Sequence, residues 1–229
     1  MSQSATALLL VGMSVCDDDR RDELLEAAAH HSGGVAFLQM ADPSLSRELT
    51  RLADTGVATI SLVGISLGSL APGQSWLRRI AAHWWRERAG HRPVIEVATR
   101  LAASIEDVEV ALGEVRPISG EEPGLTSSAW EDVSRHRRQV FVCRGPRCTA
   151  RGSEETARAL ILALMDAGLG DHDVLLTHTG CQFPCNQAPV VSVQPDDVWY
   201  GGVDPVAASR IVSEHLLADT PVEGHRLPR

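Results

Sequence analysis

The chain has 229 residues with 21 basic and 30 acidic side chains, which leaves a net charge of −9 when histidine is neutral. A length of this order allows one or two domains, each able to bury its own core. The negative charge argues against a nucleic-acid binder, and no apolar run approaches the roughly 20 residues of a transmembrane helix. The first residues lack the basic start of a secretory signal, so we expect a cytoplasmic protein without a nucleic-acid or membrane partner.

Short apolar runs alternate with segments of helical periodicity over residues 1–113. This alternation predicts an α/β domain in which a parallel sheet carries helices on both faces. Asp42 is the expected N-cap of the second helix, with Pro43 in its first turn. Ligands of such sheets bind at the carboxyl ends of the strands, here near residues 12–16 and 66–74. The expected strands are 7–11, 35–38, 57–65 and 93–98, and the expected helices are 19–30, 43–53, 76–87 and 105–112.

Residues 114–138 follow neither period and are rich in proline, glycine, serine and charge, so we predict a linker there. Trp130 in this linker is expected to pack onto one of the domains. A second α/β domain is expected over 139–217, followed by a tail at 218–229. Its first helix should have Ser153 as N-cap and Gly168 at its C-terminal end. The expected elements are strands 139–142 and 173–177, a hairpin of 190–193 and 198–200, and helices 153–168 and 206–217.

Four of the five cysteines lie in the second domain, spaced as C-x4-C (Cys143 and Cys148) and C-x3-C (Cys181 and Cys185). Each pair follows an expected strand, and a helix joins the two strands, so both loops should lie at the same end of the sheet. Four converging thiolates fit tetrahedral zinc or an iron–sulfur cluster. Zinc sites favour the shorter C-x2-C spacing, so we favour a cluster with two metal atoms, with zinc or a thiol–disulfide pair as alternatives. Cys16 stands apart, and we expect it to be a small buried apolar residue.

The segments CRGPRC and GCQFPCNQAPVVSVQPDDVWYGGVDPVAASRIVSEHL resemble the thioredoxin-like [2Fe–2S] ferredoxins, a family that includes the ferredoxin subunit of respiratory complex I. The likeness covers roughly residues 139–217. It includes both cysteine spacings, the Ala-Pro that follows, the P-x-x-V-W-Y hairpin and the I-V-x-E-H-L helix. The resemblance implies a thioredoxin-like fold, one-electron transfer, and a [2Fe–2S] cluster whose ligands are Cys143, Cys148, Cys181 and Cys185.

The first domain resembles the small sirohydrochlorin chelatases of cobalamin and siroheme synthesis. The matching parts are the opening strand and turn (ALLLVGMSV), the segment FLQMADPSL and the strand that ends in Leu-Gly. Members of that family carry one metal-handling histidine after the first strand and another after the third. The corresponding segments here read Gly-Met-Ser at 12–14 and LAPGQ at 70–74. Imidazole can act as base and metal ligand near neutral pH, whereas a thioether is no base. The domain is therefore expected to be chelatase-like but inactive.

The other ionisable residues of the first domain do not replace these histidines. His30, His31, His83 and His91 flank helices rather than strand ends, and we expect them on the surface. The acidic run 17–19 opens a helix, where the helix dipole favours carboxylates that remain solvated. No catalytic residue is predicted.

These observations predict an electron carrier that passes single electrons between a reductase and a terminal redox enzyme, with the first domain as a scaffold. Two alternatives remain: a sirohydrochlorin cobalto- or ferrochelatase with the cluster as an appendage, or a tetrapyrrole-binding assembly factor. Loss of both histidines favours the carrier over the chelatase.

Two groups of surface residues suggest partners. Helix 76–87 carries Trp76, Leu77, Ile80, Trp84 and Trp85. We assign part of this face to the partner subunit of a homodimer, and the alternative is that these tryptophans belong to the core of their own domain. Arginines surround the first cysteine pair and precede its strand. They either balance the charge of a cluster or form a basic patch for an acidic redox partner. These arginines are Arg135, Arg137, Arg138, Arg144, Arg147 and Arg151.

Overall fold

The computed structural model describes residues 5–67, 70–126 and 131–228. The chain divides into two compact units, residues 1–130 and 131–229, and each is described by itself. Trp130, which was expected to pack onto one of them, lies outside the described residues. Among the helices of the described ranges, none has both the length and the apolar character needed to cross a bilayer.

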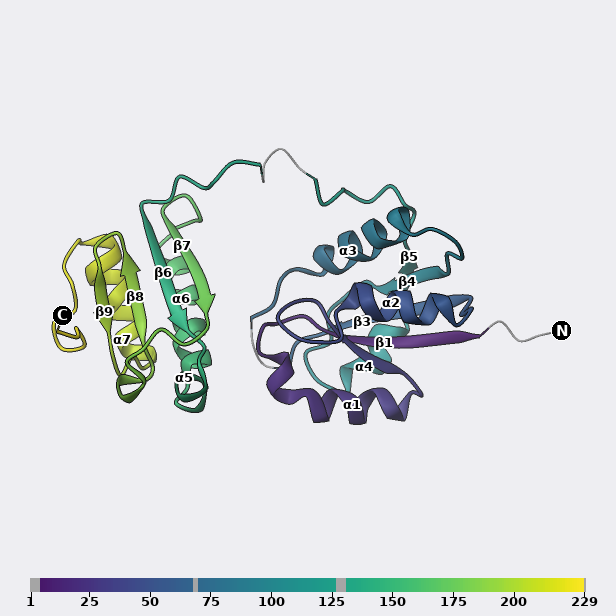
Figure 1. Cartoon of the computed structure of the whole chain (residues 1–229), viewed down its shortest axis with the longest axis horizontal. Coiled ribbons are helices and arrows are strands. Elements are labelled where there is room, and N and C mark those ends of the chain that lie inside the picture. Colours follow the sequence, from purple (N-terminus) through teal and green to yellow (C-terminus); the bar gives the residue numbers. More distant parts are fainter. Residues whose placement is uncertain (1–4, 68–69, 127–130, 229) are drawn as a thin grey trace. The chain divides into compact units, whose positions relative to one another are not determined.

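The first unit is a five-stranded sheet with a pair of helices on each face (Figure 1). The strand order is β2-β1-β3-β4-β5; the first four strands run parallel, and β5 is antiparallel to β4. The α/β class and the parallel sheet are as predicted. The elements are β1 (Thr6–Gly12), α1 (Arg21–His30), β2 (Gly34–Phe37), α2 (Leu45–Asp54), β3 (Thr59–Ile65), α3 (Gln74–Glu87), β4 (Val94–Ala98), α4 (Asp107–Leu112) and β5 (Val115–Pro117).

Two details of the first unit differ from the sequence-based expectation. Helix α2 is capped by Ser44 rather than Asp42, because the Ser44 hydroxyl accepts a hydrogen bond from the Arg47 N–H at 3.4 Å. The unit also continues past residue 113 into the expected linker. Strand β5 pairs with β4 there, and Arg78 of α3 forms an ion pair with Glu122 at 2.9 Å. A strand of three residues is too short to show a periodic pattern, so the sequence could not reveal it.

The tryptophans of α3 are used largely within the first unit. The Trp84 indole N–H donates to the Thr50 hydroxyl at 2.9 Å, and the Trp85 indole N–H donates to the Pro93 carbonyl at 3.0 Å. Arginine guanidinium groups stack over the rings of all three tryptophans, with Arg79, Arg88 and Arg92 as the partners. Part of this aromatic face is therefore used by contacts inside the unit, while Trp76, Ile80 and Trp85 remain partly exposed.

The second unit is a four-stranded mixed sheet covered by helices that share one core with it (Figure 1). Its order is β7-β6-β8-β9, with β6 and β7 parallel and the remaining pairs antiparallel. Alternate residues of β6, such as Val140 and Val142, are fully buried in this core. The elements are β6 (Arg138–Cys143), α5 (Pro146–Ala150), α6 (Ser153–Asp166), β7 (Val174–Thr179), η3 (Cys185–Gln187), β8 (Val191–Gln194), β9 (Val198–Tyr200), α7 (Pro205–Arg210) and its π-helical continuation η4 (Ile211–Leu217).

The caps of helix α6 and the position of the tail can be compared with the sequence-based prediction. Gly152, with a φ of 84°, occupies the N-cap of α6, and Ser153 is its first helical residue. Gly168 ends the helix region as predicted, in the left-handed conformation with a φ of 67°. The expected tail packs onto the sheet, because the N–H of Leu227 donates to the carbonyl of Trp199 at 2.7 Å. The second unit therefore includes residues beyond 217.

Candidate metal centre

The two parallel strands bring all four clustered cysteines to one edge of the second sheet. Cys143 is the last residue of β6 and pairs in register with Thr179 at the end of β7. Cys148 lies in α5, and Cys185 begins η3. The Sγ atoms of Cys181 and Cys185 are 3.3 Å apart. The thiols predicted from the spacing to converge thus lie on adjacent loops, each loop anchored by its own strand.

Gly145, between the first two cysteines, allows these loops to approach each other closely. A Cβ atom at this position would lie only 2.9 Å from both Cα and Cβ of Cys181, a separation that side chains essentially never show. The φ of Gly145 is −65°, so its backbone conformation suits any residue. Glycine is required here by the close contact alone, and no local pattern in the sequence distinguishes it from other loop glycines.

Burial and mutual contact set the acidity of the thiols. Burial, together with a hydrogen bond that the Cys148 thiol donates to Cys143, raises the pKa of Cys148 to about 11. The backbone N–H of Phe183, with help from Cys185, lowers the pKa of the exposed Cys181 thiol, while the hydrogen bond with Cys181 raises the pKa of Cys185. Four thiolates this close would repel one another, so without a metal the thiols favour their protonated forms. A bound metal cation takes the place of these protons and neutralises the negative charge of the sulfurs. The donor set therefore fits a thiophilic metal or cluster.

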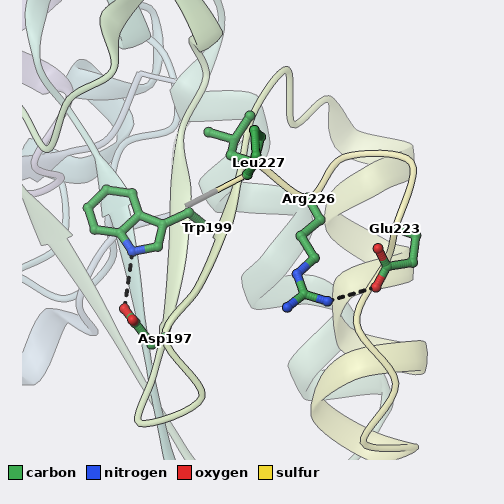
Figure 2. Close-up of a pocket in the computed structure, with 6 residues that line it drawn as sticks. Asp197, Trp199, Glu223, Arg226 and Leu227 are labelled. Carbon is green, nitrogen blue, oxygen red and sulfur yellow. Dashed lines mark hydrogen bonds and ion pairs between the residues drawn. The ribbon is translucent and has the colours of Figure 1, made fainter.

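An apolar wall backs the buried pair of cysteines. Cys143 and Cys148 are each 1% exposed and pack with Ala188 and Val190, with Trp199 of β9 against this group. On the tail side of the unit, a cavity of about 420 Å³ includes Trp199 and Leu227 in its lining (Figure 2). The Trp199 indole N–H there donates to Asp197 at 3.4 Å. The tail therefore helps to enclose the tryptophan that lines the thiol site, a role that the sequence did not indicate.

The arginines predicted either to balance the charge of a cluster or to form a basic patch are divided between the two ends of β6. Arg147 is exposed, hydrogen-bonds to Asn186 and acts electrostatically on the Cys185 thiol. Arg138 begins β6, at the end opposite Cys143, and is buried. It forms ion pairs with Asp196 at 2.5 Å and Asp219 at 2.7 Å. Arg138 thus serves the packing of the unit, because its charge is neutralised away from the thiols.

In the first unit, Met13 and Gln74 lie at the strand ends where the sequence analysis expected a ligand, and both make contacts within the unit. Met13 is fully buried, and a Cβ atom on Gly64 would lie 3.1 Å from its sulfur. The Gln74 side-chain amide donates to the carbonyl of Ala98 at 2.6 Å. His91 contacts the carbonyl of Val57 at 2.8 Å, before β3 begins and thus at the opposite edge of the sheet. Met13 and Gln74 are therefore engaged in contacts within the unit at the edge where a ligand of this sheet was expected.

Asp17 was expected to be solvated, and the structure shows otherwise. It is 1% exposed, and its carboxylate accepts the N–H of Ser14 at 2.6 Å and of Leu67 at 3.2 Å. Burial raises the pKa of Asp17, against the opposing effect of these backbone hydrogen bonds. The residue therefore ties together the loops after β1 and β3. The sequence gives no sign of this, because one of the two partners, the backbone N–H of Leu67, lies 50 residues from Asp17.

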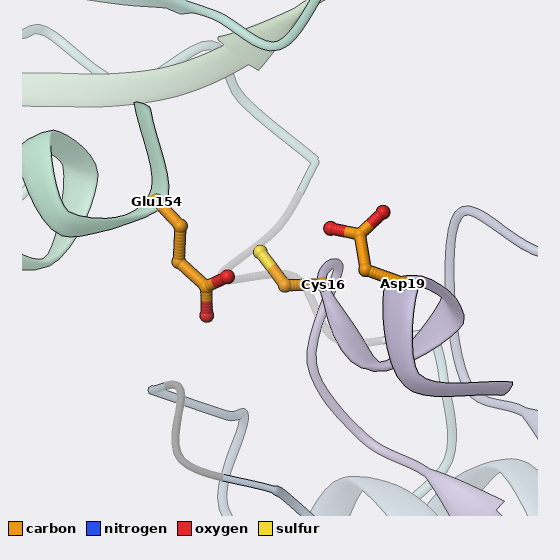
Figure 3. Close-up of side chains that lie close together, drawn as sticks. All are labelled: Cys16, Asp19 and Glu154. Atoms are coloured by element: carbon orange, nitrogen blue, oxygen red, sulfur yellow. The ribbon is translucent and has the colours of Figure 1, made fainter. Parts of the chain in front are cut away.

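Cys16 is buried, as predicted for a cysteine outside the cluster. Figure 3 shows it at the start of the 3-10 turn Asp17–Arg20, with Asp19 on the same turn. The N–H of Asp19 donates to the carbonyl of Cys16 at 3.1 Å. Glu154, also drawn there, belongs to the first turn of α6 in the second unit. All five cysteines lie among the described residues, and none forms a disulfide.

Comparison with known proteins identifies the family. No family model matches the chain. It is 37% identical over 94 residues to "Ferredoxin, 2Fe-2S" of Aquifex aeolicus, covering 38% of this chain and 85% of that protein. It is 38% identical over 92 residues to "Putative 2Fe-2S ferredoxin" of Priestia megaterium, covering 40% of this chain and 70% of that protein. A crystal structure of the wild-type thioredoxin-like [2Fe-2S] ferredoxin from Aquifex aeolicus matches with a TM-score of 0.38, covering 40% of this chain and 97% of that one. Over about two fifths of its length, the chain belongs to the 2Fe-2S ferredoxin family.

Proposed function

We propose that the second unit binds a [2Fe–2S] cluster through Cys143, Cys148, Cys181 and Cys185 and carries single electrons between a reductase and a terminal redox enzyme. The observation that carries this proposal is the convergence of four thiols at one sheet edge in a member of the 2Fe-2S ferredoxin family. The bound cluster would supply the one-electron chemistry. The chain supplies the ligands and the apolar wall around Trp199, which keeps water from the buried pair.

Metal analysis and substitution of single cysteines test this proposal. We expect chain purified without oxygen to contain iron and acid-labile sulfide in equal amounts and to become paramagnetic on one-electron reduction. Cys148→Ala should lose most of this iron, because a buried ligand is removed, whereas Cys16→Ala should retain it. Zinc without labile sulfide in the wild-type chain, or unchanged iron in Cys148→Ala, would refute the assignment.

A second function, thiol–disulfide exchange, is favoured by one specific observation. Cys181 is exposed, its pKa is lowered by the Phe183 N–H, and its sulfur lies 3.3 Å from that of Cys185. Such a pair could reduce a substrate disulfide to two thiols while it forms its own disulfide, with two electrons and two protons transferred. The two functions separate in Cys148→Ala, which should lose the cluster but keep any dithiol activity.

For the partner, we propose a redox protein with an acidic docking surface. Arg147 supports this, since it is exposed and lies close enough to influence Cys185, and Arg151 is also exposed. The overall charge of −9 makes a local basic surface at the thiol loops distinctive. Opposite charges accelerate encounter and orient the partner with its redox group toward the site.

We propose that the first unit is a chelatase-like scaffold without metal-insertion activity. The buried Met13 and the internally bonded Gln74 support this, because both occupy the edge at which the chelatase resemblance places the metal-handling histidines. A chelatase or a tetrapyrrole-binding factor would need open space at that edge. Asp17 draws the same two loops together instead.

A further inference from the structure

Gln182 lies between the last two cysteines, and its backbone and side chain make separate contacts. Its backbone N–H points to the sulfur of Cys143, at an N···S distance of 3.4 Å. Its side-chain amide donates to the Thr179 hydroxyl at 2.7 Å. The carbonyl oxygen of the same amide accepts the Ser192 hydroxyl at 2.9 Å. One half-buried residue thus contacts a cysteine sulfur with its backbone and two strands with its side chain.

The side-chain contacts join opposite sides of the central strand. Thr179 ends β7 and Ser192 lies in β8, and these strands flank β6, whose last residue is Cys143. The Gln182 amide therefore spans the end of β6. Ser192 is only 3% exposed, so its hydroxyl is held by the core rather than free to turn toward water. This arrangement fixes the Gln182 backbone directly over the Cys143 sulfur.

We propose that Gln182 is a positioning residue that holds its own N–H on the Cys143 sulfur and thereby raises the reduction potential of the redox centre. A hydrogen bond to a sulfur ligand stabilises the form with more negative charge on sulfur, and that is the reduced form. We call the two side-chain hydrogen bonds of Gln182, to Thr179 and Ser192, the side-chain clamp. Without it, the loop between Cys181 and Cys185 would let the Gln182 N–H move away from the Cys143 sulfur. The inference rests on the proposed cluster function and concerns how strongly the chain favours its reduced state.

Gln182→Met tests the clamp, because methionine keeps a similar volume and makes neither side-chain hydrogen bond. Gln187→Met is the matched control, since Gln187 is an exposed amide of the same loop. Ser192→Ala is the second variant, which removes one hydrogen bond of the clamp by a change in strand β8 and not in the loop itself. For each protein, iron and sulfide content is measured first. The midpoint potential follows by titration with redox dyes, together with hydrogen–deuterium exchange of the peptide that contains residue 182.

We expect Gln182→Met and Ser192→Ala to shift the equilibrium constant for reduction roughly threefold to tenfold toward the oxidised form. Exchange of the residue-182 peptide should be faster in both variants, and Gln187→Met should match the wild type in every measurement. Loaded variants with a wild-type potential would overturn the inference and leave the cluster function standing. If Gln182→Met does not load, the Ser192→Ala potential decides. Absence of iron and sulfide from the wild type would instead overturn the proposed function itself.

Discussion

Replacing Gly145 by alanine should separate the two cysteine loops. The added Cβ would meet Cα and Cβ of Cys181 at 2.9 Å, about 0.5 Å inside the ordinary contact limit of 3.4 Å. Both contacted atoms are close to the main chain, so no flexible side chain can swing away. Overpacking of this kind typically costs about 1–3 kcal/mol. We expect the free energy of unfolding of the second unit to fall by that amount relative to an alanine that meets no neighbour, and the iron content to fall with it because Cys181 is displaced.

Gly180→Ala is the matched control, because Gly180 directly precedes Cys181 and a Cβ there would meet nothing within 4 Å. Both substitutions restrict the unfolded chain equally, an effect worth about 0.4–1 kcal/mol in favour of the folded state. The difference between the two variants therefore measures the contact alone. Urea denaturation and iron and sulfide analysis on both proteins provide the data. Equal stability and equal iron content in the two variants would refute the role assigned to Gly145.

Three further outcomes are expected. Burial lowers the pKa of His215 in the folded chain from its ordinary value of 6.5. The stabilising effect of the neutral His215 is therefore present above that pH and is lost as the pH falls and the unfolded chain takes up the proton. Urea denaturation should show this loss of stability, and His215→Gln should make the stability less dependent on pH, whereas the exposed control His172→Gln should not. Electron transfer to an acidic partner should slow as the salt concentration rises, because charges are screened over about 8 Å at physiological salt. It should also be slower in Arg147→Glu. Rates that change neither with salt nor with this substitution would exclude docking by charge. The chain should insert cobalt or ferrous iron into sirohydrochlorin no faster than the spontaneous rate, and turnover above it would contradict the scaffold role of the first unit.

Local patterns in the sequence were sufficient for the fold class and for the choice of candidate ligands. Apolar runs alternating with helical segments predicted both α/β units, because strand and helix periodicities are properties of neighbouring residues. The two cysteine spacings, each following a strand, predicted that Cys143, Cys148, Cys181 and Cys185 would meet. That expectation needed only the rule that parallel strands end at the same edge of a sheet.

Contacts between segments far apart in the chain were decided by the tertiary structure. The sequence predicts that Asp17 is a solvated acid, whereas in the structure its carboxylate lies between backbone N–H groups of two loops. Arg138 reads as part of a basic patch until Asp196 and Asp219 neutralise it at the other end of its strand. In the sequence Gly145 is an ordinary loop glycine, whereas in the structure Cα and Cβ of Cys181 lie directly against it. In each case at least one partner lies more than 30 residues away, so no local pattern records that contact, and only the packing of the folded chain brings the two residues together.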